Sequence, residues 1–267
     1  MARILVTGST QGIGLETARQ LLTGGHHVVV HARDDSRAAQ ARAALADASG
    51  PAGAPDVVVG DLASTAATRR LALDAAEAGP LDVVVHNAGL GAPEERVVTD
   101  DGLERTFQVN VVAPYLLTCL VPPPARLVYL SSGTMRRGRL DLDDLQHEAR
   151  ARSGRFDGMQ VYADTKLADL VLALAVARRW PDVVSNAVDP GWIRTRMGGA
   201  AATGELVEGA DTPVWLATSG DEGATRSGRF VHRRQAEDVP AAATDPALQD
   251  DLLAALEDLT GTGLPSR

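Results

Sequence analysis

The sequence predicts an α/β fold in which one doubly wound parallel sheet carries helices on both faces, with all 267 residues in a single domain. Short apolar runs alternate with longer segments of helical length, and no segment repeats. Apolar runs this short are typical of strands buried on both faces, and strands separated by helices form parallel sheets. The chain exceeds the usual estimate of about 150 residues per domain, but α/β domains commonly do.

The expected elements alternate along the chain. The predicted strands are residues 4–6, 28–30, 57–59, 81–86, 126–130 and 183–188. The predicted helices are residues 15–22, 36–48, 65–78, 101–120 and 162–180. Residues 49–55 are rich in Gly and Pro and are expected to form a loop, and the three prolines 122–124 break the chain before the fifth strand.

A glycine-rich turn joins the first strand to the first helix. Glycines permit a tight turn and a close backbone approach, and the free N–H groups at the start of a helix bind phosphate. An ordinary turn is the alternative interpretation, but the strand before it and the helix after it favour a site for a dinucleotide pyrophosphate. The predicted cofactor-binding residues here are Gly8, Ser9, Thr10, Gln11, Gly12, Ile13 and Gly14.

Tyr162 and Lys166 stand four residues apart in a predicted helix. Positions at this spacing lie on one helix face, with Cβ atoms about 6 Å apart. In a cleft of low dielectric constant the ammonium would favour the ionised phenol, so that Tyr162 could exchange a proton at neutral pH. The same spacing occurs on many exposed helices, so the pair gains its meaning from the motifs that precede it.

Seven motifs follow one another along the chain: residues 7–14, Asp61-Leu62, Asn87-Ala88-Gly89, Asn110, residues 130–132, residues 162–166, and Pro190-Gly191 with Thr195. In this order they resemble the short-chain dehydrogenase/reductase family. Three residues separate Gly8 from Gly12, which resembles the single-domain type, because extended epimerases and dehydratases usually have two. The resemblance implies a Rossmann fold and an oxidoreductase that moves a hydride between a nicotinamide cofactor and a carbonyl or alcohol.

The resemblance assigns catalytic roles to Asn110, Ser132, Tyr162 and Lys166. Tyr162 would protonate the nascent alkoxide while Ser132 polarises the carbonyl. Lys166 would assist Tyr162 and hold the nicotinamide ribose, and Asn110 would hold a water that relays protons to solvent. Ser131 is the rival of Ser132, and a plain core or surface asparagine is the alternative for Asn110.

Further cofactor contacts are expected at the carboxyl ends of strands, where such sheets bind ligands. Asp61 would contact the adenine or cap the next helix, and these roles are compatible. Asn87-Ala88-Gly89 would let the backbone approach the adenosine ribose or would form a simple turn. The remaining contacts that the resemblance implies are Leu62, Tyr162, Lys166, Pro190, Gly191, Ile193 and Thr195, the last facing the nicotinamide carboxamide.

NADP(H) is favoured over NAD(H) as the cofactor. NAD-specific proteins of this type place an acidic side chain just past the second strand, where it binds the ribose hydroxyls. Ala32 is expected at that position, and the next residue, Arg33, has a guanidinium group suited to a 2′-phosphate. Asp34 and Asp35 could instead neutralise the arginine or bind a ribose, and Arg33 could be a plain surface residue.

Nearby polar residues could add donors for the same phosphate. The three candidates are His31 at the end of the second strand and Ser9 and Thr10 in the glycine-rich turn.

The connection between Ser132 and Tyr162 is longer than in typical members of the family. Residues 135–160 are strongly charged and resemble the retinol dehydrogenase-like branch, as does Asp144-Leu145-Gln146 within them. We expect this segment to be a substrate-loop insert.

Residues 196–210 begin with a Gly- and Ala-rich stretch and are expected to form a lid that orders on substrate binding. Together with the insert, Ser132, Trp192 and Met197 are expected to contact the substrate.

Composition excludes several other classes. A net charge of −9 and a pI near 5.1 disfavour nucleic acid or an anionic membrane as partner. The histidines show no metal-ligand spacing, so no metal is expected. Cys119, in an apolar segment, is expected to be a buried thiol. No apolar run reaches membrane-spanning length, so a cytoplasmic protein acting on a small carbonyl or alcohol is expected, with the formation of a homo-oligomer left open.

Two other functions are weighed. A catalytically silent NAD(P)-binding redox sensor is disfavoured because the residues for all four catalytic roles are present. A sugar-nucleotide epimerase or dehydratase is disfavoured by the glycine spacing and by a chain too short for a second substrate domain.

Overall fold

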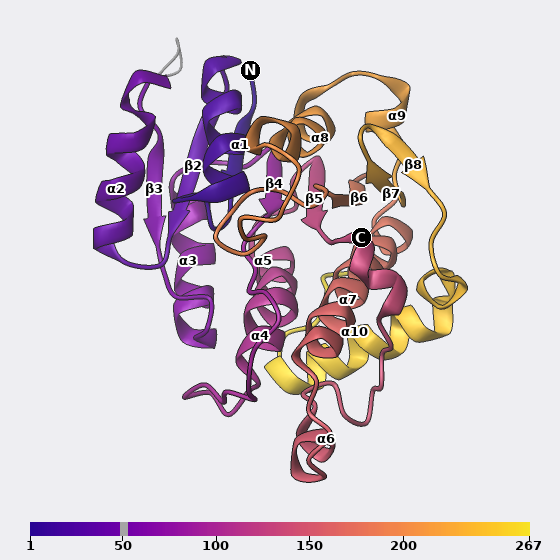
Figure 1. Cartoon of the computed structure of the whole chain (residues 1–267). Coiled ribbons are helices and arrows are strands. Elements are labelled where there is room, and N and C mark those ends of the chain that lie inside the picture. Colours follow the sequence, from indigo (N-terminus) through magenta and orange to yellow (C-terminus); the bar gives the residue numbers. More distant parts are fainter. Residues whose placement is uncertain (49–52) are drawn as a thin grey trace.

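The computed structural model describes residues 1–48 and 53–267, and its central feature is one eight-stranded sheet (Figure 1). The strands are β1 (Arg3–Val6), β2 (His27–Ala32), β3 (Asp56–Val59), β4 (Val83–His86), β5 (Arg126–Leu130), β6 (Val184–Asp189), β7 (Phe230–His232) and β8 (Gln235–Glu237). The first seven pair in parallel, and β8 pairs antiparallel with β7. This confirms the predicted single α/β domain.

The strand order β3-β2-β1-β4-β5-β6-β7-β8 reverses direction between β1 and β4. Open α/β sheets bind ligands in the crevice beyond the carboxyl ends of their strands at such a reversal. The glycine-rich turn follows β1 and Asn87 follows β4, so both stand at this point of the sheet.

The helices are α1 (Gly12–Thr23), α2 (Asp35–Leu45), α3 (Thr65–Glu77), α4 (Arg105–Phe107), α5 (Ala113–Leu120), α6 (Glu148–Arg152), α7 (Gly158–Arg179), α8 (Leu206–Thr218), α9 (Glu222–Thr225) and α10 (Pro246–Thr260). A π-helical turn, Gln108–Val112, joins α4 to α5. Short 3₁₀ turns span Ala46–Ala48, Gly133–Arg137 and Ala241–Thr244.

Two hydrophobic cores cover the two faces of the sheet. Helices α3, α5, α7 and α10 pack on one face, and α1, α2 and α8 pack on the other. Alternate residues of a strand enter opposite cores, because successive side chains point to opposite faces. Leu5 of β1 belongs to the first core, whereas Ile4 and Val6 belong to the second.

The helix predicted for residues 101–120 begins later and is not continuously α-helical. Gly102 has φ of 79°, a left-handed conformation that favours glycine and that a right-handed helix cannot include. The helix therefore cannot begin at residue 101. Glu104 caps the helix instead, with its carboxylate accepting from the Phe107 N–H at 2.6 Å. The chain then passes through the π-helical turn that contains Asn110.

Helix α7, which carries Tyr162 and Lys166, begins at Gly158 and not at the predicted residue 162. Asp157 is its N-cap, and its carboxylate accepts from the N–H groups of Met159 and Gln160. The elements after β6 were not predicted individually, and α8 begins inside the segment expected to be the lid. Of the predicted loop 49–55, residues 49–52 lie outside the described residues, and 53–55 have no regular structure.

Cys119 is buried in the first core, as predicted, and burial raises the pKa of its thiol to about 12. Among the helices of the described residues, none has the length and apolar character needed to cross a bilayer.

Candidate active site

The glycine-rich turn is shaped by close packing against the end of β4. Gly8 and Gly12 have φ of 63° and 59°, the left-handed region that glycine adopts without strain. A Cβ on Gly8 would lie 2.8 Å from the Ala88 Cα, and one on Gly14 would lie 2.3 Å from the Asn87 Nδ2. Both positions therefore require glycine, and the turn fits against Asn87-Ala88 only in this form.

The amino terminus of α1 fits an anionic group. Gln11 is the N-cap residue, but its side chain makes no capping hydrogen bond to the first turn. The first N–H groups of a helix have no intrahelical acceptor, and they bind phosphate where no side chain caps them. The residues of this turn therefore suit the pyrophosphate of a dinucleotide.

Asn87 braces the turn from the neighbouring strand. Its Nδ2 donates to the Thr7 carbonyl at 2.8 Å and to the Gly8 carbonyl at 3.3 Å. The Thr7 hydroxyl in turn accepts from the N–H groups of Asn87 and Ala88, at 2.9 and 3.0 Å. The Asn87 backbone N–H and Nδ2 thus join β4 to β1, whereas Gly89 lies beside Asn110 and Lys166, two of the residues predicted to be catalytic.

His31 and Ser9 are not donors for a phosphate. His31 is buried, its Nδ1 accepts from the Gly8 N–H at 2.9 Å, and its Nε2 donates to the Gly60 carbonyl at 2.8 Å. Burial lowers the pKa of His31, which agrees with a neutral ring. The Ser9 hydroxyl is fully buried, donates to the Val6 carbonyl and accepts from the His31 N–H. Both side chains support the turn from within, and of the three candidates only Thr10 is partly exposed.

Arg33 stands where the sequence predicted, directly after β2, with its side chain 64% exposed. Asp34 is the N-cap of α2 and accepts from the Arg37 N–H at 2.8 Å, while its second oxygen lies 3.4 Å from the Arg33 Nε. Asp34 is thereby committed to the helix, and the two terminal nitrogens of Arg33 make no hydrogen bond within the described residues. The preceding residue, Ala32, is buried, so no acidic side chain occupies its position.

Arg37, which sequence reasoning missed, brings a second guanidinium to the same place. Its Nη1 lies 3.5 Å from the Gln11 Oε1, so this arginine reaches from α2 to the glycine-rich turn. The signal in the sequence was a second arginine close after Arg33, in the first turn of the helix that follows the second strand.

Asp61 and Leu62 follow β3. Asp61 is exposed, and its Oδ1 accepts from the Ala63 N–H at 2.9 Å, which leaves Oδ2 free of partners among the described residues. The N-cap of α3 is Ser64, so the alternative of a capping role for Asp61 is wrong. Leu62 is buried in the core.

The two serines after β5 differ in the state of their hydroxyl groups. The buried Ser131 donates its hydroxyl hydrogen to the Lys166 carbonyl at 2.7 Å. The Ser132 hydroxyl accepts from the Thr134 N–H and hydroxyl at 3.2 and 3.0 Å. Because Ser132 accepts both bonds, its own hydrogen stays free to donate, and this favours Ser132 over Ser131 as the group that polarises a carbonyl.

Lys166 lies beneath Tyr162 at the same strand end. Its Nζ lies 5.9 Å from the centroid of the Tyr162 ring and donates to the Leu130 carbonyl at 2.7 Å. It also pairs with Asp169 at 2.8 Å, a contact that sequence reasoning missed. Tyr162 is half-buried, and its hydroxyl makes no hydrogen bond among the described residues.

Asn110 is buried in the π-helical turn and crosslinks two other segments. Its amide bonds both backbone groups of Leu90, at 2.7 and 3.0 Å, and donates to the Thr165 hydroxyl at 2.9 Å. A Cβ on Gly89 would lie 3.4 Å from its Oδ1 and 3.5 Å from the Lys166 Nζ. Asn110 is therefore close to Lys166, and the predicted relay stays a proposal.

The segment after β6 folds back over the glycine-rich turn. A Cβ on Gly12 would lie 3.5 Å from the Thr195 Cγ2. Ile193 of the same segment is buried against α8, where a Cβ on Gly209 would lie 2.8 Å from its Cγ1. Pro190 leads into Gly191, whose φ of 88° makes the sharp bend possible. The structure thus brings the predicted nicotinamide contacts next to the predicted pyrophosphate contacts.

Trp192 and Met197 are large apolar side chains left 58% and 53% exposed. The Trp192 indole donates to the Gly198 carbonyl at 3.0 Å, and the Met197 Cγ would lie 3.0 Å from a Cβ on Gly91. Large exposed apolar side chains are suited to contact an apolar ligand, and the assignment of both residues to the substrate stays a prediction.

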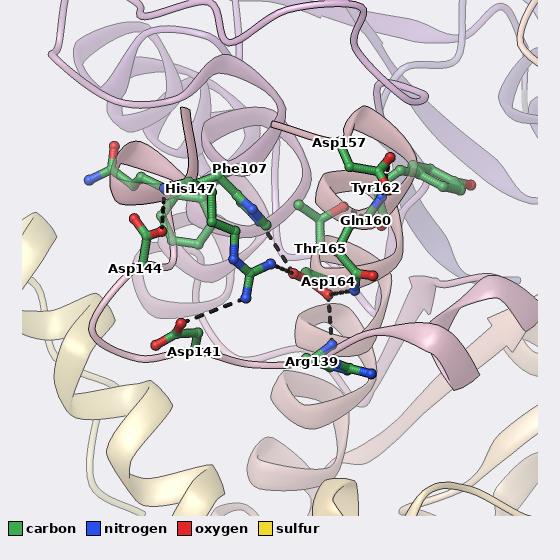
Figure 2. A network of polar contacts seen from close by, with 12 residues as sticks. Phe107, Arg139, Asp141, Asp144, His147, Asp157, Gln160, Tyr162, Asp164 and Thr165 are labelled. Atoms are coloured by element: carbon green, nitrogen blue, oxygen red, sulfur yellow. Dashed lines mark hydrogen bonds and ion pairs between the residues drawn. The ribbon is translucent and has the colours of Figure 1, made fainter. Parts of the chain in front are cut away.

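The insert is anchored to α7 through the buried carboxylate of Asp164 (Figure 2). Its Oδ1 accepts from the Arg139 N–H and the Gln160 Nε2, each at 2.6 Å. Its Oδ2 lies 3.3 Å from the His147 Nε2 and 3.6 Å from the Arg150 Nη1. Burial raises the pKa of Asp164, although each of these contacts favours the ionised carboxylate and acts in the opposite direction. Contacts of this kind specify one position of the insert against α7.

A cavity of about 640 Å³ lies against the insert, lined by Asp141, Asp143, Asp144, His147, Ala149, Arg150, Arg155, Asp157 and Gln160. Neither Ser132 nor Tyr162 lines it, and the Tyr162 ring points away from the Asp164 cluster in Figure 2. This cavity is therefore separate from the cluster of Ser132, Tyr162 and Lys166.

Comparison with known proteins agrees with this geometry. The profile of the short chain dehydrogenases matches residues 2–134. The chain is 38% identical over 266 residues to the short-chain dehydrogenase chyC of Penicillium rubens, covering 100% of both chains. It is 36% identical over 245 residues to a candidate daunorubicin C-13 ketoreductase of a Streptomyces species, covering 86% of this chain and 83% of the relative.

It is also 31% identical over 294 residues to retinol dehydrogenase 14 of Mus musculus, covering 97% and 85% of the two chains. Among solved structures, a metagenomic blue fluorescent protein in complex with NADPH matches with a TM-score of 0.70 and 25% identity, over 86% of this chain and 95% of that one. The chain is therefore an enzyme of the short-chain dehydrogenase/reductase family, in its retinol dehydrogenase-like branch.

Proposed function

We propose that the protein transfers a hydride between NADP(H) and a carbonyl or alcohol by a Ser-Tyr-Lys mechanism. The observation that carries the proposal is the state of three groups at the end of β5. Ser132 keeps a free hydroxyl hydrogen, the Tyr162 hydroxyl has no partner among the described residues, and the Lys166 ammonium is buried beneath the Tyr162 ring. A proton donor, a carbonyl-polarising group and a fixed positive charge are what carbonyl reduction requires of a protein.

The cofactor would be held by the crevice at the strand reversal. The uncapped amino terminus of α1 would bind the pyrophosphate, and Arg33 with Arg37 would bind the 2′-phosphate. Pro190, Gly191, Ile193 and Thr195 would face the nicotinamide, which supplies the hydride when bound.

The chain's own residues would manage the proton and the charge on oxygen. Ser132 donates a hydrogen bond to the carbonyl oxygen, and Tyr162 gives that oxygen its proton as negative charge develops. Lys166 offsets the charge left on Tyr162, and Asn110 holds Leu90 and α7 in register beside it. In the oxidative direction the same groups act in reverse.

A screen of aldehydes, ketones and alcohols tests this function, with nicotinamide absorbance as the readout. We expect consumption of NADPH with at least one ketone or aldehyde, and no dependence on added metal. A protein that binds NADPH tightly but turns over no member of the panel would fit the catalytically silent redox sensor, and conversion of a sugar nucleotide without net cofactor consumption would fit the epimerase.

The lid, residues 196–210, is expected to be protected from hydrogen exchange only when the site is filled. Its base is closed by two backbone hydrogen bonds, from the Arg194 N–H to the Gly204 carbonyl at 2.9 Å and from the Gly204 N–H to the Trp192 carbonyl at 3.0 Å. Most of the residues between Thr195 and Gly204 are exposed. Exchange should be fast from Gly198 to Glu208 in the free protein and slower with cofactor and a carbonyl or alcohol. Equal and strong protection in both states would identify ordinary packed structure.

A further inference from the structure

Lys166 is the only lysine in the sequence, since every other basic side chain apart from the histidines is an arginine. Its side chain is 5% exposed, as is that of Asp169, which follows one helical turn later on α7. Two of the three ammonium hydrogens are used, one by the Leu130 carbonyl and one by the Asp169 Oδ2. One donor therefore remains for a further acceptor.

Burial opposes the charge that this lysine must carry. An ammonium group removed from water loses its proton more easily, and in fully buried lysines the pKa falls by up to about 3–5 units. Here the pKa of Lys166 is instead raised, because the charges of Asp169 and Tyr162 and the hydrogen bond to Asp169 outweigh burial. The neighbouring carbonyl of Leu130 carries no charge and could not by itself keep the pKa of Lys166 raised against burial.

We propose that Asp169 is a positioning residue, which holds the Lys166 ammonium charged and directed at the end of β5 so that its third donor is presented to the nicotinamide ribose. This inference rests on the proposed function, because it assigns Asp169 a role through the lysine and not through contact with substrate. Nothing else in the proposed mechanism uses this buried carboxylate.

The titratable groups around the Lys166–Asp169 pair come from three elements, α7, β5 and β4. Tyr162 of α7 acts on Lys166, and Tyr129 of β5, which lies near Asp169, is buried with a raised pKa, so it stays neutral. His86 of β4 stacks on Tyr129 with ring centroids 4.6 Å apart, and burial lowers its pKa to about 3. Lys166 is therefore the charged partner of Asp169 across the working pH range.

The pH dependence follows from this pairing. Burial raises the pKa of Asp169 to about 6, against the effect of Lys166, so the carboxylate is ionised above that pH and protonated below it. In Asp169→Asn the charge and the charge-assisted hydrogen bond that most oppose the burial of Lys166 are lost, and the pKa of Lys166 falls. Lowering the pH then restores the ammonium in the variant, whereas in the wild type it removes the counter-charge.

Two measurements test the inference, and the first needs no cofactor. In protein labelled with ¹³C-lysine, the single Cε signal reports the protonation of Lys166 directly. The wild type should stay charged beyond pH 9 and show a small inflection near pH 6 as Asp169 takes up its proton. Asp169→Asn should titrate about three pH units lower, the size of shift that burial alone gives a lysine, so that its midpoint falls within the pH range of the binding measurement. Asp169→Glu should restore most of the difference.

The second measurement is the dissociation constant of NADPH from pH 6 to pH 8. The dissociation constant of Asp169→Asn divided by that of the wild type should be about ten at pH 8 and should approach one at pH 6. Because the cofactor titrates equally in both measurements, its own titration cancels in this ratio. Asp164→Asn is the matched control, because it removes a buried carboxylate of the same helix that bonds to the insert and not to Lys166. Its ratio should not depend on pH.

The outcomes separate this inference from the function on which it rests. A wild type that binds no NADPH would overturn the proposed function. The role of Asp169 alone would be overturned by a different combination of results. In that case the wild type binds NADPH and Lys166→Met loses affinity, but the lysine titration is unchanged in Asp169→Asn. If Asp169→Asn does not fold, a wild-type Cε titration without an inflection near pH 6 would equally contradict it.

Discussion

Replacement of Tyr162 by phenylalanine should lower the turnover number for carbonyl reduction by about 10²–10⁴-fold, the usual contribution of a positioned general acid. The ring and its packing are kept, and only the hydroxyl that would donate the proton is removed. Steady-state kinetics with a carbonyl found in the screen would measure the effect. The dissociation constant of NADPH should change by less than about twofold, because the hydroxyl is not needed to hold the pyrophosphate or the 2′-phosphate.

The same variant has a built-in control for folding. The Tyr162 hydroxyl makes no hydrogen bond within the described residues, so its loss leaves no buried group unpaired. The melting temperature should therefore match that of the wild type. Retention of most activity in a folded Tyr162→Phe protein would remove Tyr162 from the mechanism.

Replacement of Arg33 by alanine should change the choice of cofactor. Loss of hydrogen bonds from a guanidinium to a phosphate costs about 1.5–3 kcal/mol, so the KM for NADPH should rise about ten- to a hundredfold. The KM for NADH, which has no 2′-phosphate, should change little. Kinetics with both cofactors at one fixed carbonyl concentration would measure the two effects.

Arg42→Ala supplies the matched control for this prediction. Arg42 is an exposed arginine in the last turn of α2, whereas Arg33 and Arg37 stand at its start. The control should leave both KM values near those of the wild type. A native preference for NADH, or equal losses for both cofactors in Arg33→Ala, would show that Arg33 does not read the phosphate.

The fold could be predicted because its signals are local. Each of the first six parallel strands contains a short apolar run bounded by a turn. The contacts of Asn87-Ala88 that require glycine at positions 8 and 14 appear only in the structure. The boundaries that were wrong depended on single caps. Asp157 starts α7 and Glu104 starts α4, and acidic residues of this kind are frequent in loops that precede no helix.

The motifs of the site could be predicted from the sequence, but the hydrogen-bond partners and the burial of their side chains could not. Ser9 and His31 look like free donors in the sequence, yet their side chains bond backbone groups around the glycine-rich turn. Ser9 donates to the Val6 carbonyl, and His31 accepts from the Gly8 N–H and donates to the Gly60 carbonyl. Asp164 and Asp169 look like ordinary polar positions on a helix, yet both are buried. Burial and partner choice arise from segments distant in the chain, such as Arg139 for Asp164, and no local pattern encodes them.

Transfer of label from the cofactor to the carbonyl carbon tests the central claim most directly. NADPH carrying deuterium at both C4 positions would be incubated with the wild type and a carbonyl identified in the screen, and the product analysed by mass spectrometry and NMR. The proposed function predicts an alcohol with one deuterium on the former carbonyl carbon, formed by the wild type and reduced to trace amounts in Tyr162→Phe. An alcohol without the label, or binding of NADPH with no transfer to any carbonyl, would contradict it.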